Sequence, residues 1–150
     1  MRSVALLCLA LGLLAVAGCQ TQSARIAKVL PHYLDRQGRH TPAPSLFERD
    51  AHQAYLRANP DEIGGLRFDV QWVSTVYYVS GVRLRLELRG SKDPTTLVLE
   101  EEVEKRPWYQ RWTSIELDRE TYDRLGEVIA WRVTLWDADQ QLAERQSFLW

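Results

Sequence analysis

Two stretches of alternating polarity constrain the fold of this chain more than any other feature. The residues from 66 to 72 read Leu-Arg-Phe-Asp-Val-Gln-Trp, and those from 82 to 89 read Val-Arg-Leu-Arg-Leu-Glu-Leu-Arg. Successive side chains of a strand point to opposite faces, whereas a helix would spread these apolar residues around its circumference. Each stretch is therefore predicted to be a strand with one buried face and one solvent-exposed face.

Further strand and turn signals follow as far as the C-terminus. Strands are predicted at residues 97–103, 113–117 and 129–135, and a last strand from Gln141 to Trp150. Asp118 and Gly126 are suited to cap the two ends of a short helical turn. Six or seven short strands joined by turns predict a mainly β chain. An immunoglobulin-like or fibronectin-like antiparallel β-sandwich fits this pattern best.

One N-terminal amphipathic helix is predicted ahead of the sandwich. Ser45 and Glu48 form a capping box, so the helix should begin after Ser45, and Asn59 followed by Pro60 should end it. Its apolar residues share one side: Phe47, Ala51, Ala54, Tyr55 and Ala58. We expect this side to pack onto the sheet. A role at a membrane surface is the alternative, although the apolar side is small and the polar side carries both signs of charge.

The first 18 residues are predicted to be an export signal. Arg2 is their only charged residue, and the apolar run from Val4 to Val16 follows it. That run is too short for the ~20 residues that a membrane-spanning helix needs. The segment is therefore interpreted as a targeting signal and not as a membrane span.

The residues that close this run resemble the lipobox of bacterial lipoproteins, in which a branched apolar residue and two small residues precede a cysteine. Here they are Val16, Ala17, Gly18 and Cys19, and the resemblance covers residues 1–19 only. It implies that Cys19 becomes the acylated first residue, carrying acyl chains such as palmitate as a membrane anchor. Gln20 in place of aspartate implies the outer membrane, facing the periplasm. An ordinary secretory signal is the alternative, because Ala15 and Ala17 also form an A-x-A pattern.

The remainder of the chain is close to neutral and has no thiol. Removing 18 of the 150 residues leaves 18 Lys and Arg against 20 Asp and Glu, a net charge of −2. No cysteine follows Cys19, which excludes disulfides and thiolate metal sites there. Residues 19–44, in which Pro31 interrupts a helical spacing, are predicted to be the lipidated cysteine with a tether and extended linker. Residues 45–150 are predicted to form a single domain.

Charge patterning argues against a nucleic-acid partner. Three arginines share one face of a predicted strand, but three glutamates of the next strand should stand on the same face: Arg83, Arg85, Arg89, Glu100, Glu102 and Glu104. Opposite charges that face each other across strands cancel locally. We therefore expect no nucleic acid among the partners.

The densest cluster of aromatic and basic residues spans residues 105–112, in a loop and the start of a strand. Its candidate binding residues are Trp108, Tyr109, Arg111 and Trp112. Aromatic side chains stack on sugar rings in many carbohydrate-binding modules, and Trp, Tyr and Arg also concentrate binding energy in protein interfaces. The alternative is that Trp108 and Trp112 fill the core of a small domain while the cations lie beside them.

No catalytic, metal or cofactor motif is evident in the sequence. His32, His40 and His52 lie too far apart to suggest a zinc site, and no nucleophile motif or phosphate-binding glycine loop occurs. The sequence therefore predicts a membrane-anchored envelope lipoprotein that is not an enzyme and serves as a protein-binding or structural module. A glycan or peptidoglycan module is the alternative. A cell-wall hydrolase comes third, because a carboxylate pair leaves no spacing signature in a sequence.

Overall fold

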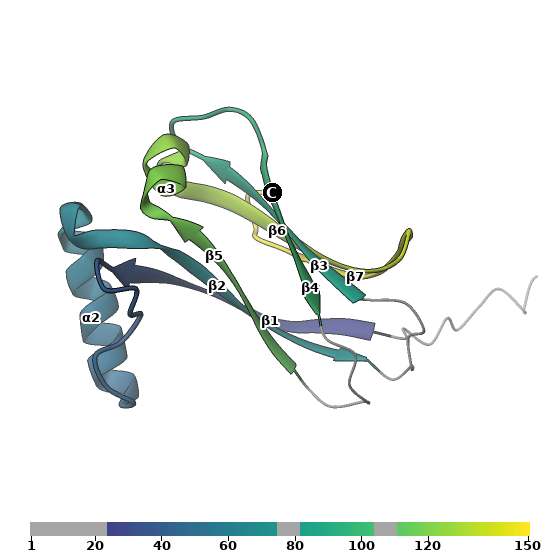
Figure 1. Cartoon of the computed structure of the whole chain (residues 1–150), viewed down its shortest axis with the longest axis horizontal. Helices are drawn as coiled ribbons and strands as arrows, with labels where there is room; N and C mark the ends of the chain where they lie inside the picture. The colour runs from purple at the N-terminus through teal and green to yellow at the C-terminus, as the bar shows by residue number, and fades with distance from the viewer. Residues whose placement is uncertain (1–23, 75–81, 104–110) are drawn as a thin grey trace, which may run out of the picture.

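The computed structural model describes residues 24–74, 82–103 and 111–150 (Figure 1). Within these ranges the chain forms seven strands, two α-helices and one short 3-10 helix. The strands are β1 (Ala24–Asp35), β2 (Ile63–Ser74), β3 (Val82–Gly90), β4 (Leu97–Val103), β5 (Arg111–Asp118), β6 (Val128–Asp137) and β7 (Gln140–Gln146). The helices are α2 (Leu46–Ala58), η1 (Pro60–Glu62) and α3 (Arg119–Leu125). The predicted mainly β class is confirmed.

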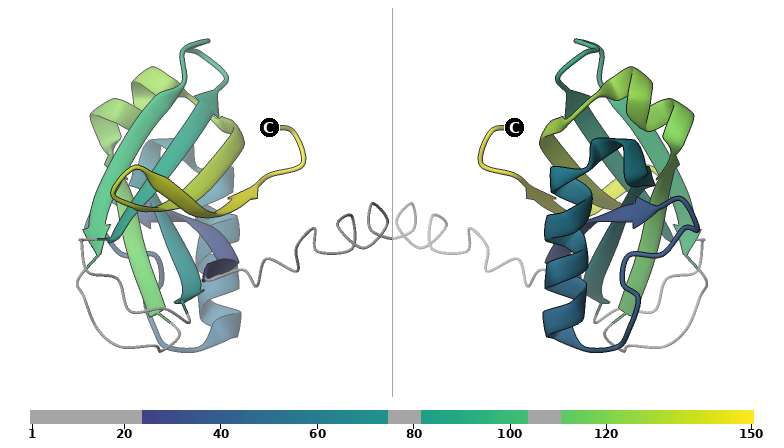
Figure 2. Two further views of the ribbon diagram at one scale, coloured as in Figure 1. Left: turned by 90° about the vertical axis from the view of Figure 1, so that its right-hand side faces the viewer. Right: turned by 90° about the vertical axis from the view of Figure 1, so that its left-hand side faces the viewer.

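The strands form two antiparallel sheets that face each other. One sheet has the order β1-β2-β5 and the other the order β4-β3-β6-β7. Figure 2 shows from two sides that α2 lies outside one sheet, while α3 lies near one end of the strands. The core is the set of apolar side chains packed together in the interior, among them Leu66, Phe68, Val70, Trp72, Leu84, Leu86, Leu88, Ile115, Leu117, Val133 and Leu135.

Both alternating stretches are strands, as predicted, and their apolar residues face the core. Phe68 and Val70 of β2 and Leu84 of β3 have no exposed side-chain surface. A shift of one residue in register would turn these side chains to the outer face, so burial specifies the pairing. Part of the predicted charge pairing forms on the outer face, where Glu100 lies 3.7 Å from Arg83 and 4.0 Å from Arg85, whereas Glu104 lies outside the described residues.

The linker predicted at residues 19–44 requires a correction. Residues 24–35 are extended, but they form β1, which pairs with β2 along almost its whole length. Ala24 and Ile26 are buried in the core, and Arg145 of β7 donates a hydrogen bond to the Ala27 carbonyl. Pro31 is tolerated because β1 is the outer strand of its sheet. The folded unit therefore includes residues 24–35.

The last strand is shorter than predicted. β7 ends at Gln146, after which the Ser147 hydroxyl accepts from the Trp131 amide and the Ser147 amide donates to the Trp131 carbonyl. The Trp150 ring lies 4.1 Å from the Arg89 guanidinium and 4.8 Å from that of Arg132. These cation–π contacts hold the terminal ring beside the strands and not within the core.

The helix boundaries agree with the capping signals. Ser45 is the N-cap of α2, and its hydroxyl accepts from the Glu48 amide. Asp118 caps α3 by accepting from the Thr121 amide, and Gly126 ends α3 with a φ of +78°, a backbone conformation that favours glycine. However, α2 follows β1 and is therefore not the first element of the domain.

Candidate functional site

The predicted aromatic site is described only in part. Arg111 and Trp112 begin β5, whereas Trp108, Tyr109 and the predicted lipidation residue Cys19 lie outside the described residues. Trp112 is 51% exposed, and the Arg111 guanidinium lies 5.7 Å from the ring centre of Trp72. Trp112 is therefore a surface residue, and the expectation that it fills the core is wrong.

The orientation of α2 is the opposite of the one predicted. Leu56 is its only buried residue, whereas Phe47 is 82% exposed and Tyr55 is 52% exposed. At about 100° per residue, Phe47 and the alanines at 51, 54 and 58 share a sector of about 60° on the side opposite Leu56. We call these four residues together with Tyr55 the outward face of α2. The expectation that this face packs onto the sheet is therefore wrong.

Polar side chains hold α2 against β1 instead. The Gln53 side-chain carbonyl accepts from the Tyr33 amide at 2.8 Å, and its NH2 group donates to the carbonyls of Tyr33 at 2.9 Å and His40 at 2.8 Å. The side-chain amide thereby pairs with a residue of β1 much as another strand would. Because three backbone groups are satisfied by one side chain, the helix needs little apolar contact to stay in place.

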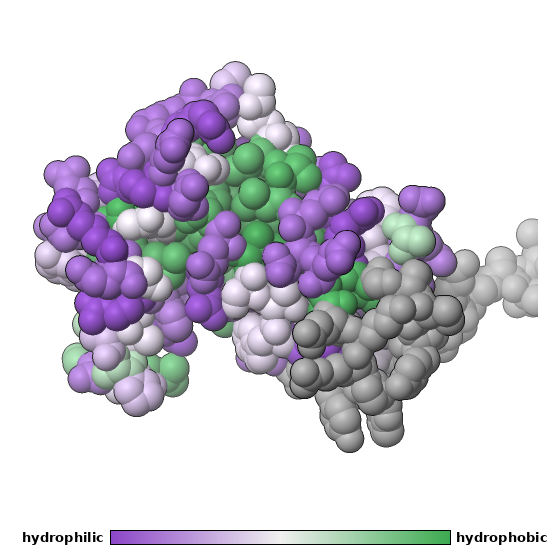
Figure 3. Space-filling model, in the orientation of Figure 1, coloured by the Kyte–Doolittle hydropathy of each residue, from purple (hydrophilic) through white to green (hydrophobic). Residues whose placement is uncertain are grey.

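The outward face of α2 is exposed apolar surface on an otherwise charged helix. The three alanines of this face are exposed like the two aromatic residues, and Leu46 at the start of the helix is 67% exposed. Figure 3 shows hydrophobic groups standing out at the lower end of α2. Exposed apolar patches of this kind mark interaction sites on soluble domains.

Histidines that are distant in the sequence meet where α2 crosses β1. The rings of His32 and His40 are 5.3 Å apart, and His32 Nε2 lies 3.7 Å from an Asp69 carboxylate oxygen. His52 Nε2 lies 3.6 Å from Asp35 Oδ2. Burial lowers the pKa of His32, and the Asp69 carboxylate offsets only part of this effect. Within the described ranges, no group of three or more His, Cys, Asp and Glu residues is arranged to hold a metal ion.

The carboxyl groups with shifted pKa values do not resemble the acid of a hydrolase. The hydrogen bond from Arg132, at 2.5 Å, lowers the pKa of Glu87, and that from the Thr95 hydroxyl lowers the pKa of Asp93. Burial would raise the pKa of Asp35, but hydrogen bonds from Arg39 and Gln37 outweigh it and lower the value. A general acid needs a raised pKa. These carboxylates are structural acceptors.

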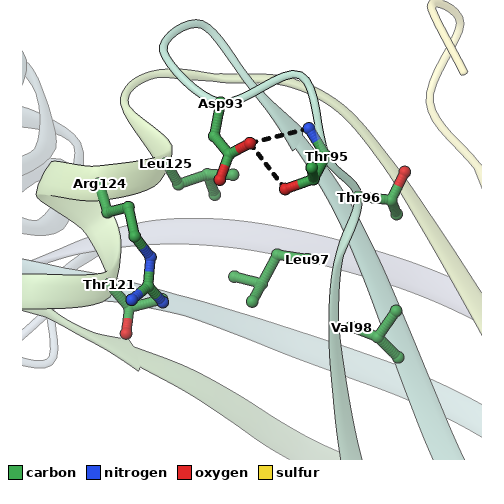
Figure 4. A pocket seen from close by; sticks show the side chains of 8 residues that line it. All are labelled: Asp93, Thr95, Thr96, Leu97, Val98, Thr121, Arg124 and Leu125. Carbon is green, nitrogen blue, oxygen red and sulfur yellow. Dashed lines mark hydrogen bonds between the residues drawn. The ribbon is translucent and has the colours of Figure 1, made fainter.

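A cavity of about 360 Å³ opens between α3, β4 and the loop that joins β3 to β4 (Figure 4). Leu97 and Leu125 provide apolar walls, and Arg124 lies at its rim. Asp93 also lines the cavity, but its carboxylate is bonded to the amide of Thr95 at 2.9 Å and to its hydroxyl at 2.6 Å. Asp93 therefore stabilises the loop through one oxygen of its carboxylate.

In the part of the chain that the structure describes, no helix combines the length and apolar character needed to cross a membrane. The sequence matches no known protein-family model and no curated protein.

Proposed function

We propose that this protein is an acylated lipoprotein of the bacterial envelope, anchored in the outer membrane at Cys19, which binds another envelope protein through the outward face of α2. The single observation that carries the binding role is the exposure of Phe47 and Tyr55 on a helix held by its polar side. We further infer that the domain belongs to the immunoglobulin and fibronectin class of sandwiches.

The strand order supports the inferred fold. Immunoglobulin-type sandwiches place strands A, B and E in one sheet and C, F and G in the other. The division of β1, β2 and β5 from β3, β6 and β7 matches that arrangement, with β4 paired to β3. Domains of this class commonly present binding surfaces on a rigid scaffold.

The spacing of the outward face favours a protein groove as the partner surface. Phe47 and the alanines at 51, 54 and 58 follow the i, i+4, i+7, i+11 pattern with which amphipathic helices enter hydrophobic grooves. Exposed aromatic residues dominate the binding energy of such interfaces, and small residues between them allow close approach. The partner is therefore a protein with an apolar groove about three turns of helix long.

The position of α2 argues against the anchoring membrane as its partner. Cys19 and Ala24 are five residues apart in the sequence, which limits their separation to about 17 Å. The 12 residues of β1 then lead away toward α2, over about 36 Å at the usual rise of a strand. Figure 1 shows α2 at the other end of the sheet from the start of β1. The outward face would therefore lie away from the anchor.

The anchor is tested by metabolic labelling with an alkyne analogue of palmitate in a Gram-negative host. We expect label on the native chain and none on Cys19→Ala. Equal labelling of both chains, or labelling of neither, would contradict the lipoprotein assignment.

The binding role is tested by photo-crosslinking in intact cells, with the photoreactive amino acid at Ala54. We expect one discrete protein adduct, which Phe47→Asp abolishes and Val98→Asp retains. Val98 is a suitable control because it is an exposed apolar residue on β4, outside the outward face. Adducts with lipid alone, or an adduct that Phe47→Asp leaves unchanged, would overturn the proposal.

Glycan binding is a second candidate because Trp112 is 51% exposed on β5. An exposed indole can stack on a sugar ring, and Arg111 precedes it in the same strand. If this function holds, Trp112→Ala should reduce co-sedimentation with purified peptidoglycan while folding is unchanged. Equal sedimentation of the native chain and the variant would exclude Trp112 from such a site.

A further inference from the structure

A second cavity opens between β1 and the first residues of β6. Its volume is about 230 Å³, and its lining comes from β1, β2, β6, both helices and Ser147. β7 pairs with β6 only from Arg132 onward, so residues 128–131 of β6 have no β7 partner beside them. The interior of the sandwich therefore reaches the surface at this place.

Aromatic and aliphatic groups form the walls of this cavity. Phe68, which has no exposed surface, and Leu66 come from β2, while Trp131 and the 51% exposed Ile129 come from β6. The rings of Tyr33 and Tyr122 meet edge to face with centres 6.3 Å apart. Such walls favour an apolar ligand group that is withdrawn from water.

Among the polar groups that line the cavity, the guanidinium of Arg57 is available to a ligand. Gln53 is committed to the backbone groups of Tyr33 and His40, as described above. Arg57, one turn further along α2, also lines the cavity, and it has no hydrogen bond or ion pair with any described residue. Among the described residues that line the cavity, none is acidic. A ligand with a negative charge near Arg57 would therefore meet an uncompensated positive charge.

We propose that this cavity binds a small hydrophobic carboxylate, with its chain against Ile129 and Trp131 and its carboxylate at Arg57. A cavity of about 150 Å³ holds benzene, which has six carbon atoms. In the same proportion, a cavity of about 230 Å³ accommodates about nine carbon atoms. Octanoate, with eight carbons, is a suitable probe. The proposal requires neither acylation at Cys19 nor the protein partner of α2, and it succeeds or fails independently of both.

The test is isothermal titration calorimetry on the predicted mature chain, residues 19–150 with Cys19→Ala, which lacks the apolar signal and the acyl chains and therefore needs no detergent. Sodium octanoate, octan-1-ol and sodium acetate are titrated below the concentration at which octanoate forms micelles. We expect octanoate to bind about two- to fivefold more tightly than octan-1-ol, the range for an exposed ion pair, and acetate to give no binding. Arg57→Gln should remove the difference between octanoate and octan-1-ol. Arg25→Gln, which changes an exposed arginine of β1 outside the cavity, should preserve it.

A second variant tests the location. Ile129→Trp places a larger ring at the mouth of the cavity and should weaken octanoate binding at least tenfold. Val98→Trp, which enlarges an exposed residue of β4, should leave it unchanged. Absence of octanoate binding, equal affinity for octanoate and octan-1-ol, or binding that survives both Arg57→Gln and Ile129→Trp would overturn the proposal. If Ile129→Trp does not fold, the charge comparison at Arg57 still decides it.

Discussion

The interior of the sandwich and the contact between α2 and β1 are built from opposite kinds of side chain. Between the sheets, residues such as Phe68 and Leu86 are apolar and fully buried. Between α2 and β1, Gln53 makes three hydrogen bonds to backbone groups, and Leu56 is the only buried residue of the helix. Where a second sheet covers a strand, the spacing of its apolar residues therefore indicates which side is buried. For a helix that is held by polar contacts, the same kind of spacing does not indicate the buried side.

The largest change in stability should come from a substitution in the interior of the sandwich. Phe68→Ala removes a fully buried ring from β2, and we expect it to lower the free energy of unfolding by about 3–5 kcal/mol, because a cavity replaces packed atoms. Urea denaturation followed by circular dichroism measures this change. Tyr55→Ala is the matched aromatic control on α2 and should have little effect. A loss below about 1 kcal/mol for Phe68→Ala would show that the interior is not tightly packed.

A smaller loss is expected at the contact between α2 and β1. Gln53→Ala leaves the amide and carbonyl of Tyr33 and the carbonyl of His40 without their partner, which should lower stability by about 1–3 kcal/mol. The same denaturation experiment applies. Gln141→Ala removes an exposed side-chain amide that donates to Glu144 and should be near neutral. If the two substitutions have equal effects, hydrogen bonds do not hold α2 in place.

The same contact should make stability depend on pH. Because burial lowers the pKa of His32 in the folded state, protonation favours the unfolded chain. At a pH well above 6.5, the unperturbed pKa of histidine, His32 is neutral in both states and has no effect on stability. As the pH decreases from there through the lowered pKa of His32, stability should fall. His32→Gln should flatten this part of the stability profile, measured as denaturation midpoints between pH 8 and pH 5. Parallel profiles for the two chains would contradict the assignment.

The smallest effect is expected on the outward face of α2. Phe47→Ser should change stability by less than about 0.5 kcal/mol, because the side chain is 82% exposed. A loss of about 3 kcal/mol or more in the free energy of unfolding, measured by urea denaturation, would mean that Phe47 packs in a core, as its spacing alone suggests. That result would reverse the orientation of α2.

The sequence was sufficient for most of the fold, since local physics decides it. Alternation places Phe68 and Leu84 inward whatever surrounds them, and Ser45 and Asp118 mark helix starts through bonds to amides three residues ahead. β1 was harder to identify because its burial does not alternate regularly and it contains Pro31. Its strand character follows from pairing with β2, which is a contact between distant residues.

The candidate sites were predicted less well because they depend on tertiary contacts. Arg111 and Trp112 stand at the start of β5, but the exposure of Trp112 does not follow from its spacing in the sequence. No sequence signal brings His32 within 5.3 Å of His40, or joins Arg57 to Trp131 around one cavity. The only available hint for α2 was Gln53, a polar residue on the side predicted to face solvent.

The contact between Gln53 and Tyr33 also protects the protein against self-association. The unpaired edge of a sheet is a template on which another chain can add a strand and begin to aggregate. In β1, Pro31 has no amide hydrogen to offer, and the amide and carbonyl of Tyr33 are already occupied by Gln53. An acyl anchor would hold copies of the chain at high density on one surface. Under those conditions, the blocked edge of β1 would keep neighbouring copies from joining into a continuous sheet.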